Sequence, residues 1–401
     1  MTTVAIICEY NPFHNGHKYH LDKIREEFGS DTAIIAIMSG NYTQRGELAI
    51  LPKQYRAKAA LLSGIDLVLE LPFPFSSSSA EIFARSAVGI IDSLGIVDVI
   101  SFGSESGDIN SLTEAASVFE SEVFASYIKQ ASNSKALGYP KLCEEAFNAA
   151  GGKSCFDFTS NNILAIEYIK ALRFLGSRIT PHTVLRNGSP YNSNDAYESS
   201  FPSALSIRNA YIQGDKLTES MITKPSLEAI SEATDKMDMP TDVSRLSAAI
   251  ISYLRLNPPS GSEDIYDAKD GIYNRLYNAS QEASDVNSLL RLCESKSYTN
   301  ARYRRAMWNI FFGVTSSDVK VLPEYTQLLG ANSIGLSLLK KAGASKGISI
   351  VTKPSAVSGL SKTALRQKEL SDKADMIYEL SKPMPKSARS PYTFTPFIKK
   401  Q

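Results

Sequence analysis

The first 190 residues alternate between short apolar runs and amphipathic segments. Four of the runs are almost continuously apolar and rich in valine and isoleucine, as in parallel strands buried on both faces. These are TVAIIC (residues 3–8), TAIIAIM (32–38), DLVLEL (66–71) and VDVISF (97–102). A later strand-like run, RITPHTVL, covers residues 178–185.

Helical patterns separate these runs. They begin near His17, at Lys53 and at Ser79, and the last two end on Gly64 and Gly95. Serine before a helix and glycine after it are typical capping residues. A further helix is expected over residues 161–176. This alternation predicts an α/β fold with a doubly wound parallel sheet.

Beyond about Gly214 the pattern becomes helical, with polar loops between the helices. Helices are expected within residues 225–237, 242–256, 288–295 and 302–314. The pattern predicts an α/β domain over residues 1–214 and a mainly helical region over 215–401. The segment GISIVTKPS (347–355) is a candidate additional strand, and the proline-rich tail from Lys382 is expected to be extended.

Composition and charge narrow the function classes. The chain has 401 residues, 43% of them hydrophobic and 21% charged, and a formal net charge of +1. A nearly neutral globular protein has no overall attraction to nucleic acid, so any such surface must be local. The cysteines at positions 8, 143, 155 and 293 lack the spacing of a zinc site or a disulfide framework. No apolar run has the length of a signal peptide core or a membrane span, so a cytoplasmic protein is expected.

Three of the four histidines lie in the twelve residues EYNPFHNGHKYH (9–20), between the first strand and the first helix. Open α/β sheets bind ligands at this carboxyl edge. Gly16 lets backbone approach a ligand, and the start of the helix attracts anions. We expect His14 and His17 to donate N–H groups to phosphate, with His20 one turn deeper on the same helix face.

Other readings of the histidines fit the pattern less well. A zinc site would use histidines spaced i, i+4 and a nearby cysteine or carboxylate ligand. A dinucleotide fingerprint would need G-x-G-x-x-G between the first strand and helix, and the sequence has none. Chance matches to His-x-Gly-His occur, so an ordinary helix start stays open as an alternative.

His-x-Gly-His after a first α/β strand is the signature of the nucleotidyltransferase superfamily. Longer stretches resemble, closely and in order, the bacterial tRNA(Met) cytidine acetate ligase family. They are EYNPFHNGHKYHL (9–21), IAIMSGNYTQRGE (35–47), DLVLELPFPFSSSSAEIFA (66–84), ISFGSESGDI (100–109), SNNILAIEYIKAL (160–172) and YTNARYRRAMWNI (298–310).

The resemblance implies a Rossmann-like nucleotidyltransferase domain that forms acetyl-adenylate and pyrophosphate from ATP and acetate. The acetyl group then passes to the wobble cytidine of elongator tRNA(Met), giving N(4)-acetylcytidine. Mg²⁺ is expected with ATP. By similarity the catalytic residues are His14 and His17, and ATP is bound by Ile7, Cys8, Glu9, Tyr10, Asn11, Pro12, Phe13, His14, Asn15, Gly16, His17, Lys18, Tyr19, His20, Gly103, Asn162 and Arg186.

Three further segments are candidates for substrate contacts, with a solvated loop or helix face as the alternative for each. The loop after the second strand offers Asn41, Gln44, Arg45 and Glu47 for an acetate or cytidine pocket. The segment from Ser203 to Arg208 is similar to the Ile-Ser-Ser-Thr-x-Ile-Arg element of other nucleotidyltransferases, although Ala204 and Leu205 depart from it. For tRNA, a basic patch contains Lys296, Arg302, Arg304 and Arg305, with Tyr298 and Tyr303 beside them. The tail over residues 382–400 has a similar basic and aromatic composition.

Two rival functions remain at this level. One is a nucleotidyltransferase that acts on a small phosphorylated metabolite. The other is a non-catalytic tRNA-binding protein that holds a nucleotide. The sequence does not indicate the oligomeric state.

Overall fold

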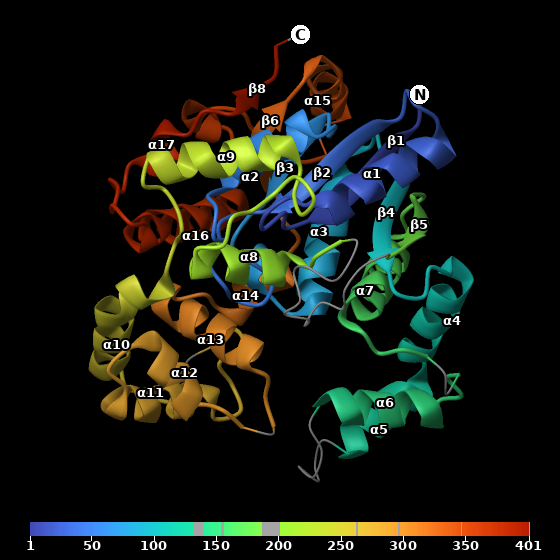
Figure 1. The fold of residues 1–401 in the computed structure, drawn as a ribbon. Helices are drawn as coiled ribbons and strands as arrows, with labels where there is room; N and C mark the ends of the chain where they lie inside the picture. Colours follow the sequence, from blue (N-terminus) through green and yellow to red (C-terminus); the bar gives the residue numbers. More distant parts are fainter. Residues whose placement is uncertain are drawn as a thin grey trace.

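Figure 1 shows the computed structural model, which describes residues 1–131, 139–153, 156–186, 201–261, 264–295, 297–345 and 347–400. A central sheet has the strand order β5-β4-β1-β2-β3-β6-β7, with β8 beside β6. The strands are β1 (Thr3–Cys8), β2 (Ala33–Ser39), β3 (Leu67–Leu71), β4 (Val99–Ser104), β5 (Thr180–Leu185), β6 (Tyr325–Ala331), β7 (Ser349–Val351) and β8 (Phe397–Ile398). The first five pair in parallel, which confirms the predicted doubly wound sheet.

The four helices predicted in the first half are present as α1, α2, α3 and α7, whereas α4, α5, α6 and α8 were not predicted. Ser79 and Gly95 are the N-cap and C-cap of α3, as expected, whereas α2 ends at Leu62 and is capped by Ser63. The first helix begins at Asn15, two residues before the expected start at His17. The helices are α1 (Asn15–Phe28), α2 (Lys53–Leu62), α3 (Ala80–Leu94), α4 (Ile109–Phe119), α5 (Glu122–Ala131), α6 (Tyr139–Ala149), α7 (Ser160–Leu175) and α8 (Ala204–Gln213).

The C-terminal region is mainly helical, as predicted. Its helices are α9 (Lys224–Asp235), α10 (Ser247–Leu256), α11 (Ile272–Glu282), α12 (Val286–Leu292), α13 (Asn300–Phe312), α14 (Ser316–Lys320), α15 (Ser333–Ser345), α16 (Lys362–Tyr378) and α17 (Ser390–Thr393). Among the described residues, no helix is long and apolar enough to cross a membrane.

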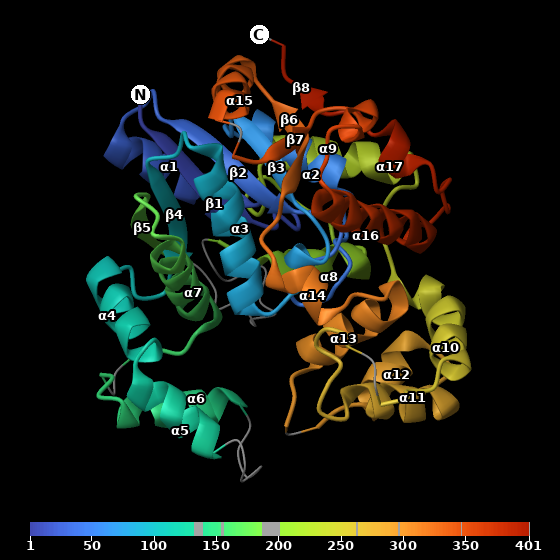
Figure 2. The same cartoon turned by 180° about the vertical axis from the view of Figure 1, so that it is seen from behind.

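Successive residues of the central strands point to opposite faces of the sheet, and helices cover both faces. In β1, Val4 and Ile6 face a core that includes residues of α1, α2 and α9. Ala5, with Ile35 and Ile37 of β2, faces a core that includes residues of α3, α7 and α15. Figures 1 and 2 show the two helix layers from opposite sides. Burial on both faces explains why these strands read as unbroken apolar runs.

The last third of the chain completes the same sheet. Strand β6 lies antiparallel to β3, with Leu67 paired to Ala331, and β7 and β8 lie parallel to β6. Strand β7 falls in the predicted segment 347–355, whereas β6 was not predicted. The expectation of an extended tail was wrong over α17, which is helical, whereas β8 is extended and pairs with β6. The division at residue 214 stays a prediction.

Helices α10 to α13, at the lower left of Figure 1, pack with α16 around a third core. Trp308 is its largest fully buried side chain. Tyr42 and Phe73, which follow β2 and β3, enter this core, and the Tyr42 ring lies 5.1 Å from Trp308 edge to face. The segments at the carboxyl edge of the sheet therefore pack into the core of the helical cluster.

Candidate active site

Two histidines cap the start of α1. His14 is the N-cap residue, and its Nδ1 accepts the N–H of Gly16 at 3.0 Å. His17 lies in the first turn, and its Nδ1 accepts the N–H of His14 at 3.1 Å. A neutral imidazole has one donor and one acceptor nitrogen, so each ring here carries its proton on Nε2. Capping thus leaves both histidines with an N–H donor for a ligand.

The surroundings keep these imidazoles neutral. Burial, followed by the charges of Arg186 and Arg208, lowers the pKa of His14 to about 3. Burial, followed by His14, Arg186 and His20, lowers the pKa of His17 well below its usual value. At neutral pH the positive charge near the α1 N-terminus therefore comes from the two arginines and the helix dipole.

Close packing fixes the two rings. Their centroids are 3.7 Å apart, and the Tyr10 ring meets His17 edge to face at 4.8 Å. A Cβ atom on Gly16 would lie 2.9 Å from Cε1 of His14, so a side chain at position 16 would displace that ring. Glycine is thus required here by His14, in addition to any ligand.

Arg208 joins the histidine loop to the loop after β2. From α8, whose N-cap is Ser203, Nη1 of Arg208 donates to the carbonyl of Asn11 at 3.0 Å, and Nη2 lies 3.3 Å from Oε2 of Glu47. The Arg208 side chain is only 11% exposed. The segment whose role was open in the sequence therefore supplies a fixed cation beside His14.

Arg186, which follows β5, is the second arginine whose charge acts on His14 and His17. Its backbone N–H donates to the carbonyl of Ser104 at 3.0 Å, and its Nε lies 3.6 Å from Oε1 of Glu105. A Cβ on Gly103 would come within 3.1 Å of Cγ of Arg186. Asn162 is buried, and its Oδ1 accepts the N–H groups of Glu105 and Ser106 at 3.0 and 3.2 Å. Asn162 thus shapes the loop that positions Arg186.

The loop after β2 contacts the histidine loop through Gln44, while its Arg45 and Glu47 bond Ser160 of α7 and Arg208 of α8. The N–H of Gln44 donates to Oε1 of Glu9 at 2.9 Å, and Nη2 of Arg45 donates to Oγ of Ser160 at 3.0 Å. Glu47 binds Arg208, as described above. Asn41 points elsewhere: its buried amide bonds the Lys53 N–H and a carboxylate oxygen of Asp375, both at 2.9 Å.

Several residues of the predicted ATP motif face away from the two imidazoles. Nδ2 of Asn15 donates to the carbonyls of Glu219 and Ser220 at 2.9 and 2.8 Å, and Lys18 pairs with Asp22. The Tyr19 ring packs against Phe201. Ile7, Cys8, Tyr10, Asn11, Pro12 and Phe13 form the end of β1 and the half-buried or buried turn before α1. Of these, Tyr10 and Phe13 do contact the His17 ring, at 4.8 and 5.5 Å between centroids.

His20 belongs to a chain of hydrogen bonds that leads to the surface. Its Nε2 lies 2.8 Å from Oγ of Ser101, which is 2.9 Å from Nδ1 of His182. Nε2 of His182 lies 2.8 Å from Oε2 of Glu27, whose side chain is 58% exposed. This anchoring suits the supporting role expected for His20, which stays a prediction.

The predicted basic patch on α13 has acidic neighbours. Nε of Arg305 lies 2.7 Å from Oδ2 of Asp267, and Arg302 lies 3.4 Å from Asp267 and 3.1 Å from Asp270. Nε of Arg304 donates to the carbonyl of Arg45 at 3.0 Å, and its Nη2 lies 3.4 Å from Glu47 Oε1.

These pairs reduce the net charge of the patch, and Arg304 also holds the loop after β2. The predicted Lys296 lies outside the described residues. A role of these residues in binding tRNA stays a prediction.

Two buried cations near the site were not predicted. Arg56 of α2 is fully buried and donates to the carbonyls of Glu9, Ser39 and Leu51 at 2.6, 3.0 and 2.8 Å, so it ties together the segments after β1 and β2. Lys53 of the same helix lies 2.8 Å from both carboxylate oxygens of Glu70 and 2.6 Å from Oδ2 of Asp375. The only sign of these two buried cations in the sequence is that a charged residue falls on the buried face of the helix.

The lowered histidine pKa values predict how stability depends on pH. An unfolded histidine takes up a proton near pH 6.5, whereas His20 stays neutral in the fold until about pH 3 because of burial and then the charges of His182 and Arg186. Stability is therefore lost as pH falls below about 6.5. Urea unfolding of wild type and His20→Gln, which keeps a polar group at the Nε2 position, should show that the variant loses about 1–2 kcal/mol less between pH 7 and 5. Equal losses in the two proteins would contradict the assignment.

Comparisons with known proteins agree over nearly the whole chain. The sequence model of the HIGH Nucleotidyl Transferase family matches residues 1–391. A protein of Thermoanaerobacter sp. strain X514, named tRNA(Met) cytidine acetate ligase, is 38% identical over 383 residues, which cover 92% of this chain and 93% of the relative. A Clostridium perfringens protein of the same name is 34% identical over 416 residues, covering 99% and 100%. The crystal structure of Thermotoga maritima TmcAL bound with alpha-thio ATP matches with a TM-score of 0.90 at 28% identity, over 100% of both chains.

Proposed function

The chain belongs to the HIGH nucleotidyl transferase family and, within it, to the tRNA(Met) cytidine acetate ligases; we propose that the groups around the α1 N-terminus carry out its adenylation step. The resemblance that the sequence suggested is thereby confirmed. The activity is ATP-dependent ligation of acetate to the wobble cytidine of elongator tRNA(Met), in the cytoplasm. The observation that supports this site best is the gathering of His14, His17, Arg186 and Arg208 at one helix start.

In the first step an oxygen of acetate attacks the α-phosphorus of ATP, and pyrophosphate leaves. Negative charge grows on the phosphate oxygens in the transition state. The Nε2–H groups of His14 and His17 donate to these oxygens, and Arg186 and Arg208 balance the charge. Because the imidazoles are neutral and held by the capping bonds, they need no reorientation during the reaction.

In the second step the exocyclic amine of cytidine attacks the acetyl carbonyl of acetyl-adenylate. A C–N bond forms, AMP leaves with the electrons of the C–O bond, and the amine loses a proton. Gln44, Arg45 and Glu47 lie on the loop bonded to the histidine loop, so we assign the acetate and cytidine contacts to them. No covalent intermediate with the enzyme is required.

Mg²⁺ is proposed to enter with ATP. Among the described residues, no three histidine, cysteine, aspartate or glutamate side chains gather as a metal site. Mg²⁺ at nucleotides commonly keeps several waters and binds phosphate oxygens, with one or two carboxylates at most. When bound it would neutralise charge on the triphosphate, and the carboxylates that could hold it are Glu9, within the histidine loop, and Glu47, which pairs with Arg208.

The proposed function is tested by two assays on the same protein. Acetate should stimulate exchange of labelled pyrophosphate into ATP without tRNA, and mass spectrometry of tRNA(Met) incubated with ATP and acetate should show N(4)-acetylcytidine. Exchange that needs a phosphorylated metabolite instead of acetate would favour the nucleotidyltransferase rival. Acetylation that survives loss of both imidazoles, in a His14→Asn and His17→Asn variant, would contradict the site assignment.

A further inference from the structure

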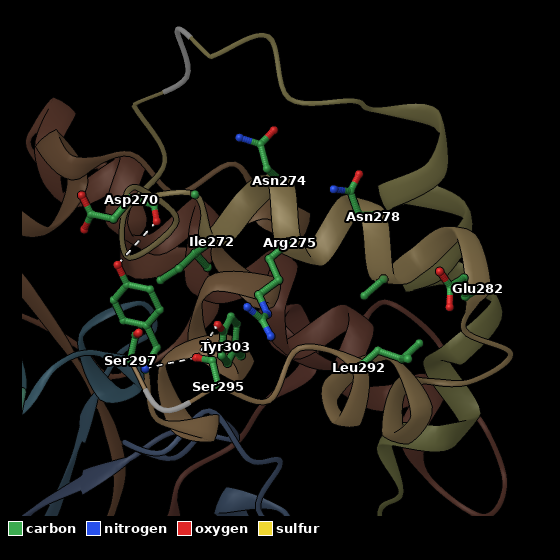
Figure 3. Close-up of a pocket in the computed structure, with 13 residues that line it drawn as sticks. Asp270, Ile272, Asn274, Arg275, Asn278, Glu282, Leu292, Ser295, Ser297 and Tyr303 are labelled. Carbon is green, nitrogen blue, oxygen red and sulfur yellow. Dashed lines mark hydrogen bonds between the residues drawn. The ribbon is translucent and has the colours of Figure 1, made fainter. Parts of the chain in front are cut away.

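A hollow of about 470 Å³ opens in the helical cluster, between α11 and the described residues 292–295 and 297–303 (Figure 3). This volume lies in the range of pockets that hold small molecules or single nucleotide units. The residues that matter here are Asn274, Arg275 and Asn278 on α11, with Tyr298 and Tyr303 opposite. None of them belongs to the site around the histidines.

One wall of the hollow is aromatic. Tyr298 is half-buried, and its hydroxyl donates to the carbonyl of Asp270 at 3.4 Å. The Arg302 guanidinium lies 4.5 Å from the Tyr298 ring centroid and covers one face of that ring, and the Arg275 guanidinium lies 6.0 Å from the centroid of the buried Tyr303. Aromatic rings and guanidinium planes are the surfaces on which proteins stack unpaired bases.

The rim offers amides. Asn274 and Asn278 are four residues apart on α11, so they lie on the same helix face, and both are exposed. Figure 3 shows both amides clear of the labelled side chains. Within the described part of the chain, no hydrogen bond is made by either side chain. Each amide has donors and an acceptor, which is the combination that pairs with the polar edge of a base.

The charge in the hollow favours a base over a phosphate. Its described lining includes the carboxylates of Asp270 and Glu282 and the guanidinium of Arg275, and Asp270 is already paired with Arg302 at 3.1 Å. Nη2 of Arg275 already donates to the carbonyl of Glu294 at 2.7 Å. In the described part of the lining the cations already have partners, so a phosphate gains little there, whereas a neutral base needs no cation.

We propose that this hollow binds one unstacked base of the tRNA substrate, with the base against the Tyr298 wall and its edge at Asn274 and Asn278. The inference rests on the proposed function. It also gives different roles to the tyrosines and the arginines of the basic patch predicted from the sequence. Tyr298 and Tyr303 line an RNA subsite, while Arg304 and Arg305 hold the loop after β2 and Asp267.

The test replaces both rim amides in the full-length protein. Asn274→Ala with Asn278→Ala should weaken binding of an elongator tRNA(Met) transcript about tenfold and leave acetate-dependent pyrophosphate exchange unchanged. A matched control is Asn148→Ala, an exposed asparagine on α6, which Figures 1 and 2 place far from α11. A second variant, Tyr298→Leu, should weaken tRNA binding to a similar degree. Unchanged binding in both pocket variants would overturn the proposal.

Abasic substitutions identify the base. In an anticodon stem-loop assayed with the unsubstituted protein, one abasic position should weaken binding about tenfold, and the same position should have no further effect with the double asparagine variant. Additive losses at every position would overturn the proposal. If the unsubstituted protein shows no acetate-dependent exchange and no acetylation, the proposed function fails, and this outcome is distinct from a failure of the pocket.

Discussion

Replacing His17 by asparagine is expected to lower acetate-dependent pyrophosphate exchange by about 10²–10³-fold, the usual effect of removing one preorganised donor to developing negative charge. The amide oxygen of the introduced asparagine takes the position of the imidazole Nδ1, so it can still accept the N–H of His14 and cap α1. The Nε2–H donor is lost. The variant therefore separates the capping bond from the bond to phosphate.

His17→Gln is the matched control. Its amide reaches the position of Nε2 but leaves the His14 N–H without its present partner. We expect the glutamine variant to be less stable than the asparagine variant and yet more active in exchange. Thermal unfolding and exchange rates measured on both proteins distinguish a role of His17 as helix cap from a role as donor to phosphate. If activity follows stability in the two variants, His17 acts only as a cap.

Lys53→Met is expected to lower the free energy of unfolding by about 3–5 kcal/mol, because it leaves the buried carboxylates of Glu70 and Asp375 without their cation. The three side chains are 5%, 2% and 10% exposed. Burial raises the pKa of Glu70 even with Lys53 present. Without the lysine, the folded protein should bind protons that the unfolded chain does not. Its stability should then rise as pH falls from the raised pKa toward the ordinary carboxyl range.

Lys58→Met provides the comparison on the same helix. Lys58 lies 2.6 Å from Glu232, but the two side chains are 32% and 33% exposed. Solvent screens this pair, so its loss should cost less than about 1 kcal/mol. Urea unfolding of both variants at pH 7 and pH 5 tests the contrast. Equal losses at the two positions, or a Lys53→Met deficit that grows at pH 5, would contradict the interpretation.

The parts of the fold that the sequence predicts are those in which local pattern and tertiary environment agree. Strands β1 to β4 are buried on both faces, so their apolar runs are sufficient evidence. Strand β6 was missed because YTQLLGA mixes polar and apolar residues, and its conformation depends on pairing with β3 far away in the chain.

The candidate site likewise has a local part that the sequence predicts and long-range contacts that it does not. The strand, turn and helix around His14 and His17 are local, and their pattern predicts a phosphate site. The contact between Arg208 and Glu47 and that between Arg304 and Glu47 join three distant segments. Such pairs have no periodicity, so a sequence shows the charged residues without their partners. For the same reason the sequence did not predict that Asp267 pairs with Arg305.

The late closure of the sheet has a consequence for synthesis on the ribosome. Strand β3 ends at Leu71, and its neighbour β6 begins at Tyr325, about 250 residues later. At about 5–20 residues per second, the edge of β3 has no native partner for roughly 12–50 s after it is made. An uncovered strand edge invites pairing with other chains. Because α2 and α3 pack on the faces of the sheet and leave this edge open, the nascent protein should depend on chaperones until its last third emerges.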